Sequence, residues 1–326
     1  MSEITLVEAV TQALAYELAH DQDVLVFGED VGANGGVFRA TEGLQKRFGS
    51  DRVFDTPLAE SMIAGMAVGM AAEGLKPVAE IQFLGFIYSA FDHIVSHASR
   101  LRNRTRGRLS CPMVIRAPYG CGIHAPEHHS ESTEALFAHI PGLRVVMPSS
   151  PTRAYGLLLA AIRDPDPVIF LEPTRIYRKI KQNVPDDGQA LPLDRCFLLR
   201  EGSDVTLVSW GAMLTETMAA AHTLETQGIS AEVIDVATLK PLDMDSIIQS
   251  VEKTGRCVII HEAARTCGIG AEIAAQLAEK ALTSLIAPIQ RVTGFDTIVP
   301  LYKMEHLYLP SEARILTAVH EVMAFE

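Results

Sequence analysis

Helical and strand-like patterns alternate along the first half of this chain, and that alternation limits the folds it can adopt. Apolar residues recur on one face between 5 and 20, and a short apolar segment over 24–28 follows. The same order repeats as far as 168–171. Strands separated by helices are normally parallel, because the helix carries the chain back across the sheet. The sequence therefore predicts an α/β fold with a mainly parallel sheet that helices cover on both faces.

The expected elements fall into two groups with a polar segment between them. The first group contains helices at 5–20, 41–48, from 57, 86–102 and 152–163, and strands at 24–28, 52–54, 77–81, 113–117, 145–147 and 168–171. The second contains strands at 205–210, 231–236, 257–260 and 289–292, and helices at 213–227, 244–253, 269–282 and 311–323. Because the intervening segment is polar and rich in proline, we expect two α/β domains, 1–180 and 200–326, joined by a linker over 181–199.

Composition and charge exclude several classes of function. The chain has 48% hydrophobic and 21% charged residues, which is typical of a globular protein with large cores. Its net charge of −12 argues against nucleic acid or an anionic membrane as the main partner. Five arginines alternate along the segment 100–108, but no aromatic residues lie between them. We therefore interpret this cluster as a subunit contact rather than an RNA-binding site.

Cysteine usage and apolar segments indicate the compartment. The five cysteines form no C-x-x-C pair, so we expect free thiols in a reducing compartment. Helical sequence begins at Thr5, and neither an apolar signal core nor an Arg- and Ser-rich transit region precedes it. The longest apolar run, over 62–72, is too short to span a bilayer. We expect a cytoplasmic protein, or a mature form that has already been trimmed.

The segment 54–69 is the most informative about function. Thr56 is a suitable helix cap and Pro57 a suitable first helical residue, so we expect a helix that begins at Pro57. Glu60 then lies in the first turn of a helix that is otherwise almost without charge. A carboxylate there is either a partner for the helix dipole or a buried acid kept for chemistry. The residue types leave both interpretations open.

Three histidines lie in the segment 123–130. The residues 124–128 match an H-x-x-E-H zinc-peptidase pattern, but that mechanism needs its ligands on one face of a helix. Pro126 lies inside the segment and two glycines precede it, which opposes a helix. We therefore predict a loop that presents imidazoles over a cleft, where they can exchange protons near neutral pH.

The motif around Glu60 resembles the D-T-P-(I/L)-(S/A)-E motif of the thiamine-diphosphate-dependent 2-oxo acid dehydrogenases, in the beta subunit of their decarboxylating component. The resemblance covers nearly the whole chain and keeps the family's order. Further matches lie at 26–32, 35–39, 80–83, 129–130, 141–143, 161–164, 238–243 and 268–272. The resemblance implies a thiamine-diphosphate pyrimidine-binding domain followed by a transketolase C-terminal-like domain.

The resemblance also implies roles for individual residues. Glu60 would hold N1′ of the cofactor's aminopyrimidine, and Phe86 would pack on that ring. His129 would lie beside the reacting carbon, orient the 2-oxo acid carboxylate and serve the acylation of the lipoyl group. The implied sets are Glu60 and His129 as catalytic, Glu29, Leu58, Glu60, Gln82 and Phe86 as cofactor-binding, and His124 and His129 as substrate-binding. The residue types alone leave structural roles open, as core for Phe86 and as a loop cap for Glu29.

The same resemblance implies parts that this chain lacks. Relatives hold the cofactor's diphosphate through Mg²⁺ at a Gly-Asp-Gly motif, and this chain contains no such tripeptide. We therefore expect an α₂β₂ heterotetramer in which an alpha subunit supplies the Mg²⁺ site and half of the thiamine diphosphate site. A dihydrolipoyl acyltransferase core would be the next partner. The resemblance further implies a potassium site at Met113, Ala161, Ile162, Asp164 and Asp166.

The expected activity is of the pyruvate dehydrogenase type in a bacterial cytoplasm, namely oxidative decarboxylation of pyruvate and reductive acetylation of lipoyl groups. The phrase Gly-Ile-His-Ala-Pro-Glu at 122–127 resembles pyruvate-type relatives. Branched-chain 2-oxo acid and acetoin-cleaving beta subunits are alternatives, because one methylene in such a pocket is worth only about 1–3 kcal/mol. A non-catalytic assembly subunit is a further alternative, which the intact Glu60 and His129 oppose.

Overall fold

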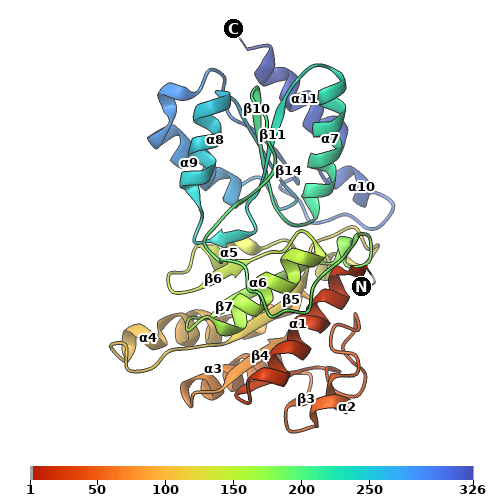
Figure 1. Cartoon of the computed structure of the whole chain (residues 1–326), viewed down its shortest axis with the longest axis vertical. Coiled ribbons are helices and arrows are strands. Elements are labelled where there is room, and N and C mark those ends of the chain that lie inside the picture. The colour runs from red at the N-terminus through yellow and green to blue at the C-terminus, as the bar shows by residue number, and fades with distance from the viewer. Residues whose placement is uncertain (1–2, 326) are drawn as a thin grey trace.

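The computed structural model describes residues 3–325 and contains two large sheets with helices packed around them. Figure 1 shows the first sheet in the red-to-green part of the chain and the second, above it, in the green-to-blue part. The predicted α/β class, with two mainly parallel sheets flanked by helices, is confirmed. All five cysteines are free thiols, as predicted. Within residues 3–325, no helix is both long enough and apolar enough to cross a membrane.

Seven strands form the first sheet, in the order β12-β6-β7-β5-β4-β2-β3. They are β2 (Val24–Gly28), β3 (Val53–Asp55), β4 (Lys76–Glu80), β5 (Val114–Tyr119), β6 (Arg144–Val146), β7 (Val168–Pro173) and β12 (Thr238–Lys240). Every pair is parallel except β12 with β6. Parallel pairing places the carboxyl ends of β2, β3, β4 and β5 along one edge of the sheet, namely the edge formed by the ends of the strands.

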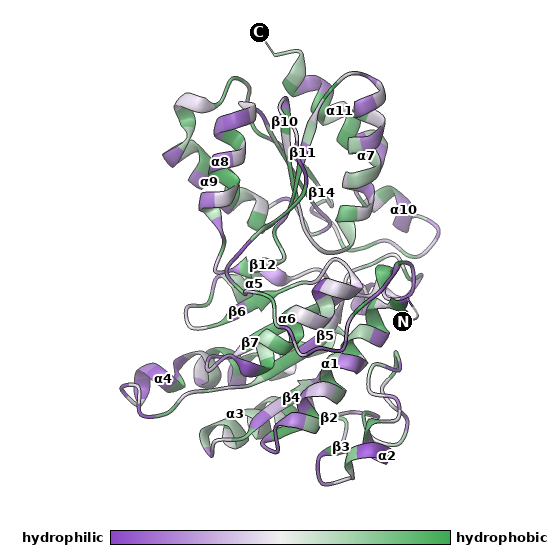
Figure 2. Ribbon diagram, viewed as in Figure 1, coloured by the Kyte–Doolittle hydropathy of each residue, from purple (hydrophilic) through white to green (hydrophobic). Residues whose placement is uncertain are grey.

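Helices cover both faces of this first sheet. On one face α1 (Leu6–His20) packs along α6 (Pro151–Arg163), and the two share an apolar cluster with β2, β5 and β7. Thr5 caps α1 and Ser150 caps α6 through their side-chain oxygens, which accept backbone N–H groups that the helices leave free. The other face is covered by α3 (Glu60–Ala72) and the short helical turns that pack against it. In Figure 2 the strands β5 and β7 are largely green between these layers, as expected for strands buried on both faces.

Five strands form the second sheet, in the order β14-β13-β10-β11-β9. They are β9 (Phe197–Arg200), β10 (Val205–Ser209), β11 (Ala231–Asp235), β13 (Cys257–His261) and β14 (Gln290–Thr293). Only β9 is antiparallel to its neighbour. Figure 1 shows α7 (Leu214–Thr226) and α11 (Glu312–Met323) on one side of this sheet, and α8 (Met244–Thr254) and α9 (Ile269–Lys280) on the other.

The two halves of the chain are joined more closely than a polar linker suggests. The strand β12 belongs to the second half but pairs with β6 at the edge of the first sheet. Within the predicted linker 181–199, β8 (Lys181–Gln182) pairs with β1 (Ile4–Thr5), and β9 begins before the segment ends. One apolar cluster also runs through both halves and includes Met147 and Trp210. The domain limits 1–180 and 200–326 therefore stay a prediction.

The helix predicted to begin at Pro57 begins three residues later, at Glu60, and this prediction was wrong. The segment 56–59 is irregular, and its first residue is tied to the end of β2, because the Thr56 N–H donates to the carbonyl of Gly28 at 2.9 Å. Ala59, not Thr56, is the cap residue. Glu60 still lies in the first turn of the helix, as predicted.

The single helix predicted over 86–102 is instead a series of different helical turns. It comprises η1 (Leu84–Ala90), a 3₁₀ segment, η2 (His93–His97), a π-turn, η3 (Ala98–Arg100), also 3₁₀, and α4 (Leu101–Arg104). Gly142 packs against the carbonyl of Ser99, where a Cβ would overlap it, so tertiary packing interrupts regular helix here. The remaining short elements are α2 (Leu44–Phe48), η4 (Glu127–His129), α5 (Glu134–Ala138), η5 (Thr174–Ile176), η6 (Gly211–Met213), η7 (Leu282–Ser284) and α10 (Glu305–Tyr308).

Candidate functional site

The structure brings most of the predicted site residues to one edge of the first sheet. Glu29 directly follows β2, the irregular segment before Glu60 follows β3, and Gln82 follows β4. The loop that contains His129 follows β5. These four strands are neighbours and run parallel, so the segments after them meet at the same edge.

Two carboxylates lie together at this edge. Glu29 is buried, with 6% of its surface exposed, and its Oε1 accepts no hydrogen bond from any residue in 3–325. Burial raises the pKa of Glu29, and the negative charges of Glu60 and Asp30 raise it further. Glu60 is half-buried at the start of α3, and the Ser89 hydroxyl donates to its Oε2 at 3.3 Å. Glu29, which the sequence left as either a member of the acid network or a loop cap, is thus a buried acid beside Glu60.

An aromatic cluster stands beside the carboxylates. The ring centroid of His129 lies 4.5 Å from that of Phe83 and 5.1 Å from that of Phe86, with edge-to-face geometry in both pairs. Phe83 and Phe86 are themselves 5.6 Å apart. Nδ1 of His129 is buried and has no hydrogen-bond partner among the described residues. Phe86 and His129 therefore lie together, as predicted, while the sequence assigned no role to Phe83 although it ends the matching segment 80–83.

The histidine loop, residues 120–132, approaches the aromatic cluster closely. After Pro126 it forms one 3₁₀ turn, η4. It does not form the helix that a zinc peptidase needs, as the proline predicted. Gly85 makes the approach possible, because a Cβ there would overlap the carbonyl oxygen of His128. The ring of His128 is 5.2 Å from that of Phe86. The loop therefore packs directly on η1, which carries Phe86.

The other predicted residues lie around this cluster rather than in it. Gln82 Nε2 donates to Asp30 Oδ2 at 3.3 Å, beside the carboxylates. Leu58 is 81% exposed, and Met62 and Tyr88 are also exposed at the same edge. His124 faces the second half of the chain, where its Nδ1 lies 3.0 Å from Glu305 Oε2. Apolar side chains that are left exposed beside a buried acid are typical of a site that another surface covers.

The residues of the predicted potassium site also come together, but at the opposite edge of the sheet. Met113 directly precedes β5 and Asp166 precedes β7, and the Val168 N–H donates to the Met113 carbonyl at 3.0 Å. The Ala161 carbonyl accepts the N–H of Asp164 at 3.4 Å. The two carboxylates already have cationic partners: Arg144 Nε lies 2.9 Å from Asp164, and Arg102 Nε lies 2.6 Å from Asp166. The carbonyls of Met113 and Ala161 thus already accept backbone N–H groups and both carboxylates are paired with arginines, and the potassium site stays a prediction.

The arginine cluster 100–108 lies on and after α4, which projects from the first sheet and is purple in Figure 2. Its five arginines are all exposed. Arg102 is the member that pairs with Asp166. The interpretation of this cluster as a subunit contact stays a prediction.

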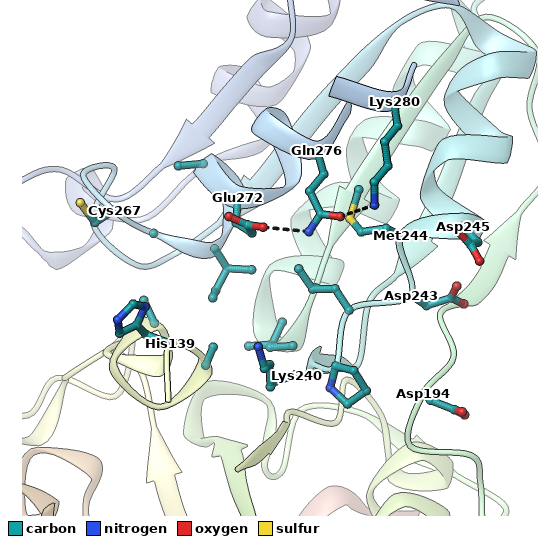
Figure 3. A pocket seen from close by; sticks show the side chains of 18 of the residues that line it. His139, Asp194, Lys240, Asp243, Met244, Asp245, Cys267, Glu272, Gln276 and Lys280 are labelled. Carbon is teal, nitrogen blue, oxygen red and sulfur yellow. Dashed lines mark hydrogen bonds between the residues drawn. The ribbon is translucent and has the colours of Figure 1, made fainter. Parts of the chain in front are cut away.

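A cavity of about 940 Å³ lies away from the carboxylates, between β12, α5 and the start of α9. Figure 3 shows its polar lining, in which Gln276 donates to Glu272 at 2.8 Å and Lys280 donates to Gln276 at 2.9 Å. Both family-like segments of the second half, 238–243 and 268–272, contribute to its wall. Those two motifs therefore shape the junction of the two sheets and not the carboxylate site.

Comparison with known proteins assigns the chain to a family. Residues 2–179 match the family model described as transketolase, pyrimidine binding domain, and residues 195–315 match transketolase, C-terminal domain. The chain is 49% identical over 325 residues to "Pyruvate dehydrogenase E1 component subunit beta" of Staphylococcus aureus (strain N315) and of Bacillus subtilis (strain 168), with 100% of each chain covered. This chain belongs to the pyruvate dehydrogenase E1 beta-subunit family. The resemblance inferred from the motif around Glu60 is thus confirmed.

A solved structure supports the fold of this E1 beta-subunit family member independently. The structure is titled "Split gene transketolase, inactive beta4 tetramer", and it matches with a TM-score of 0.80 over 99% of both chains. Because its sequence identity is only 23%, it supports the fold of this chain and nothing about its activity. The pyrimidine-binding domain of the family implies thiamine diphosphate as the cofactor.

Proposed function

We propose that this chain is the beta subunit of an acetyl-transferring pyruvate dehydrogenase component, which decarboxylates pyruvate oxidatively and acetylates lipoyl groups. The main support is the full-length 49% identity to beta subunits of that name. The gathering of Glu29, Glu60, Phe86 and His129 at one sheet edge supports a working site rather than an assembly role alone. The proposal includes the sequence-based roles of these residues.

The side chains at this edge fit an aminopyrimidine ring. The face of Phe86 provides an apolar surface for a flat ring, and Glu29 Oε1 and His129 Nδ1 are buried polar atoms without partners among the described residues. Buried polar atoms normally have partners, so both suit a polar ligand. When bound, thiamine diphosphate would supply the carbanion-stabilising chemistry that decarboxylation of a 2-oxo acid requires.

The carboxylates would hold and move the proton at N1′. Glu60 is the residue that we assign to this atom, and Glu29 stands behind it with a pKa raised by burial. The raised pKa of Glu29 favours its neutral form, which lessens the like-charge repulsion between the two carboxyl groups. A carboxyl pair of this kind is the type of group that general acid–base catalysis uses.

The histidines would serve the substrate. His129 lies against Phe83 and Phe86, so its ring is oriented by packing and can hold a proton or a carboxylate beside the cofactor ring. The two phenylalanines would also exclude water from this position. His124 lies further out, and Nδ1 is the ring nitrogen that lies beside Glu305. Nε2 is therefore the ring nitrogen that is left for a ligand. We assign His124 to the entering 2-oxo acid.

We propose that an alpha subunit completes the site in an α₂β₂ heterotetramer and holds Mg²⁺ at the cofactor's diphosphate. Leu58 and Met62 lie exposed beside Glu60, which supports a protein surface closing over them. A dihydrolipoyl acyltransferase core would receive the acetyl group. A potassium ion at Met113, Ala161, Ile162, Asp164 and Asp166 would act at a distance from the carboxylates, because these residues lie at the opposite sheet edge.

The test is to co-express this chain with its alpha partner and to measure thiamine-diphosphate-dependent CO₂ release. Pyruvate and 3-methyl-2-oxobutanoate are compared on the same purified complex, and the isolated chain serves as the control. We expect preference for pyruvate and no activity from the isolated chain.

Preference for the branched acid would assign the chain to branched-chain 2-oxo acid degradation and reject the pyruvate proposal. Release from neither acid by a stable complex would reject both, and acetoin cleavage would then be assayed on the same sample. Activity of the isolated chain would reject the shared site.

A further inference from the structure

Two buried acids of the second half of the chain contact the histidine loop of the first half. Glu305 begins α10 and Glu262 directly follows β13, so both belong to the second transketolase-type unit. Their side chains nevertheless point out of that unit and bond to the loop over 120–132. The positions of the loop's histidines therefore depend on the other half of the molecule.

Glu305 makes three contacts with the first part of the loop. Only 2% of its surface is exposed, and its two carboxylate oxygens accept the backbone N–H groups of Gly122 and His124, the second at 3.3 Å. Oε2 also lies 3.0 Å from Nδ1 of His124. Burying a carboxylate is unfavourable unless such donors surround it, and here the donors all come from the histidine loop.

The contact also places the His124 ring. Nδ1 is the ring nitrogen beside the Glu305 carboxylate, at 3.0 Å from Oε2. The side chain is otherwise 72% exposed, so the ring is open to an entering ligand. His124 also has a φ of +62°, a backbone conformation that residues with side chains rarely adopt. The hydrogen bond from its N–H to Glu305 helps to hold the backbone in that conformation.

Glu262 secures the other part of the loop. Ser132 donates to its Oε1 at 3.0 Å, and Gly120 packs so closely that a Cβ at this position would overlap the same oxygen. Gly120 also has a φ of +85°, so glycine is required there for two reasons. The loop is thus held near both ends, and His129 between them rests on Phe83 and Phe86.

We propose that Glu305 is a positioning residue for the active-site histidine loop, which it holds in place through the backbone N–H groups of Gly122 and His124 while placing the His124 ring beside its carboxylate. The inference rests on the proposed function for its catalytic consequence and on the contacts above for its structural one. Glu305 touches neither the carboxylates nor the aromatic cluster, so it acts through the loop. The second domain thereby takes part in the site of the first.

The test compares E305A and E305Q with a matched control, E232Q. Glu232 is also a glutamate of the second half, buried to a similar extent, and it accepts the N–H of Gly202 at 3.2 Å while pairing with Lys253. It does not contact the histidine loop. Amide hydrogen exchange is measured on the full chain alone, for peptides that cover 120–132, and again in the complex with the alpha subunit.

In E305A we expect exchange at Gly122 and His124 to be at least about tenfold faster, with the peptides of β10 and β13 unchanged. In E305Q the introduced amide can still accept one N–H, so exchange should lie between wild type and E305A. In the complex, E305A should lower kcat/KM for pyruvate by about tenfold or more, with E305Q partly restored and E232Q within about twofold of wild type. Equal protection of the loop amides in E305A, or an equal loss in E232Q, would overturn the proposal.

The two proposals fail in different ways. If the wild-type complex does not turn over pyruvate, the proposed function is wrong, while the exchange data on the loop still decide whether Glu305 positions it. If the complex is active and E305A leaves both exchange and kcat/KM unchanged, only the positioning role is wrong. E305A can also destabilise the fold as a whole, and E305Q, which keeps the volume and one acceptor, then carries the test.

Discussion

At the scale of single residues, the acid that the motif singled out and the acid that the fold buries are different. The motif around residue 60 pointed to Glu60, which is half-buried beside Ser89. Burial and a raised pKa fall on Glu29, one strand away. Glu29 and Glu60 come close together because β2 and β3 pair in parallel, which brings the residues after these strands side by side. The proton-handling unit that we propose is therefore the pair.

We expect E60Q to lower the rate of pyruvate turnover by the complex at least about 100-fold, because an amide cannot exchange the proton that we assign to N1′. The complex should still assemble, since within residues 3–325 Glu60 makes one side-chain hydrogen bond, to Ser89. Activity is measured as CO₂ release and assembly by size-exclusion chromatography. The control is E73Q, at the exposed other end of the same helix. Full activity in E60Q would exclude Glu60 from the mechanism.

At the scale of the element, α3 shows why its small residues are needed. Gly65 faces the ring of His93 in η2, where an added Cβ would lie 3.3 Å from Cε1. Gly69, one turn later, meets no atom within 4 Å. Within this chain the helix is therefore closely packed at Gly65 and open at Gly69. An open, uncharged helix face with a glycine on it is suited to close approach by a second chain.

The glycine at 69 can be tested by its opposite effects on folding and assembly. In the isolated chain, G69A should raise the free energy of unfolding by up to about 1 kcal/mol, because alanine is the better helix former and the space is free. If the face is a subunit interface, the same variant should weaken association with the alpha subunit. G65A is the comparison, and it should destabilise the isolated chain because His93 must move. Chemical unfolding and analytical ultracentrifugation measure the two effects, and unchanged association of G69A would exclude this face from the interface.

At the scale of the whole molecule, several acids are buried near the junction of the two halves, and Glu262 of the second half accepts a hydrogen bond from Ser132 of the first. The Tyr119 hydroxyl donates to Glu134 Oε2 at 2.7 Å, and burial raises the pKa of Glu134 to about 7. Burial likewise raises the pKa of Glu262 to about 7, while it lowers the pKa of His261 to about 3. Both acids are therefore mostly neutral below about pH 7, and the histidine beside them is mostly neutral above about pH 3.

These shifts predict how stability depends on pH. The pKa of Glu134 is near 4.5 when unfolded and about 7 when folded, so between these values only the folded chain keeps the proton. The stabilisation is complete below about pH 4.5 and is lost as the pH rises through about 7. We therefore expect the melting temperature to fall between pH 5 and 8, and to fall less in E134Q, whose amide imitates the neutral carboxyl.

Comparing E134Q with wild type cancels the contribution of His261 to the pH dependence of stability. That contribution has the opposite sign to that of Glu134, because the pKa of His261 is lowered. Differential scanning calorimetry at pH 5, 6, 7 and 8 on wild type, E134Q and the exposed control E73Q measures the difference. If E134Q and wild type lose stability in parallel over this range, Glu134 does not carry a raised pKa.

The local sequence pattern was sufficient to predict the helices and strands that are long or wholly apolar. The strand 24–28 was predicted at its observed bounds, since an apolar run that ends at a glycine leaves little choice of register. Helix α6 was predicted within one residue because Ser150 and Pro151 mark its start. The strand β12 was not predicted, because it has three residues and pairs with a strand almost 100 positions earlier. The segment 86–102 had a helical pattern, but contacts such as that of Gly142 with Ser99 broke it into turns.

The sequence by itself determined the fold class and the family, because periodicity and motifs are local properties of the chain, and the same motifs predicted that Glu60, Phe86 and His129 belong to one site. Only the tertiary structure decided that Glu29 is the buried acid, that Phe83 joins the aromatic cluster and that Glu305 contacts the histidine loop. Burial and charge coupling depend on residues that are far apart in the chain. They come into existence when the strands pair and the two sheets close on each other.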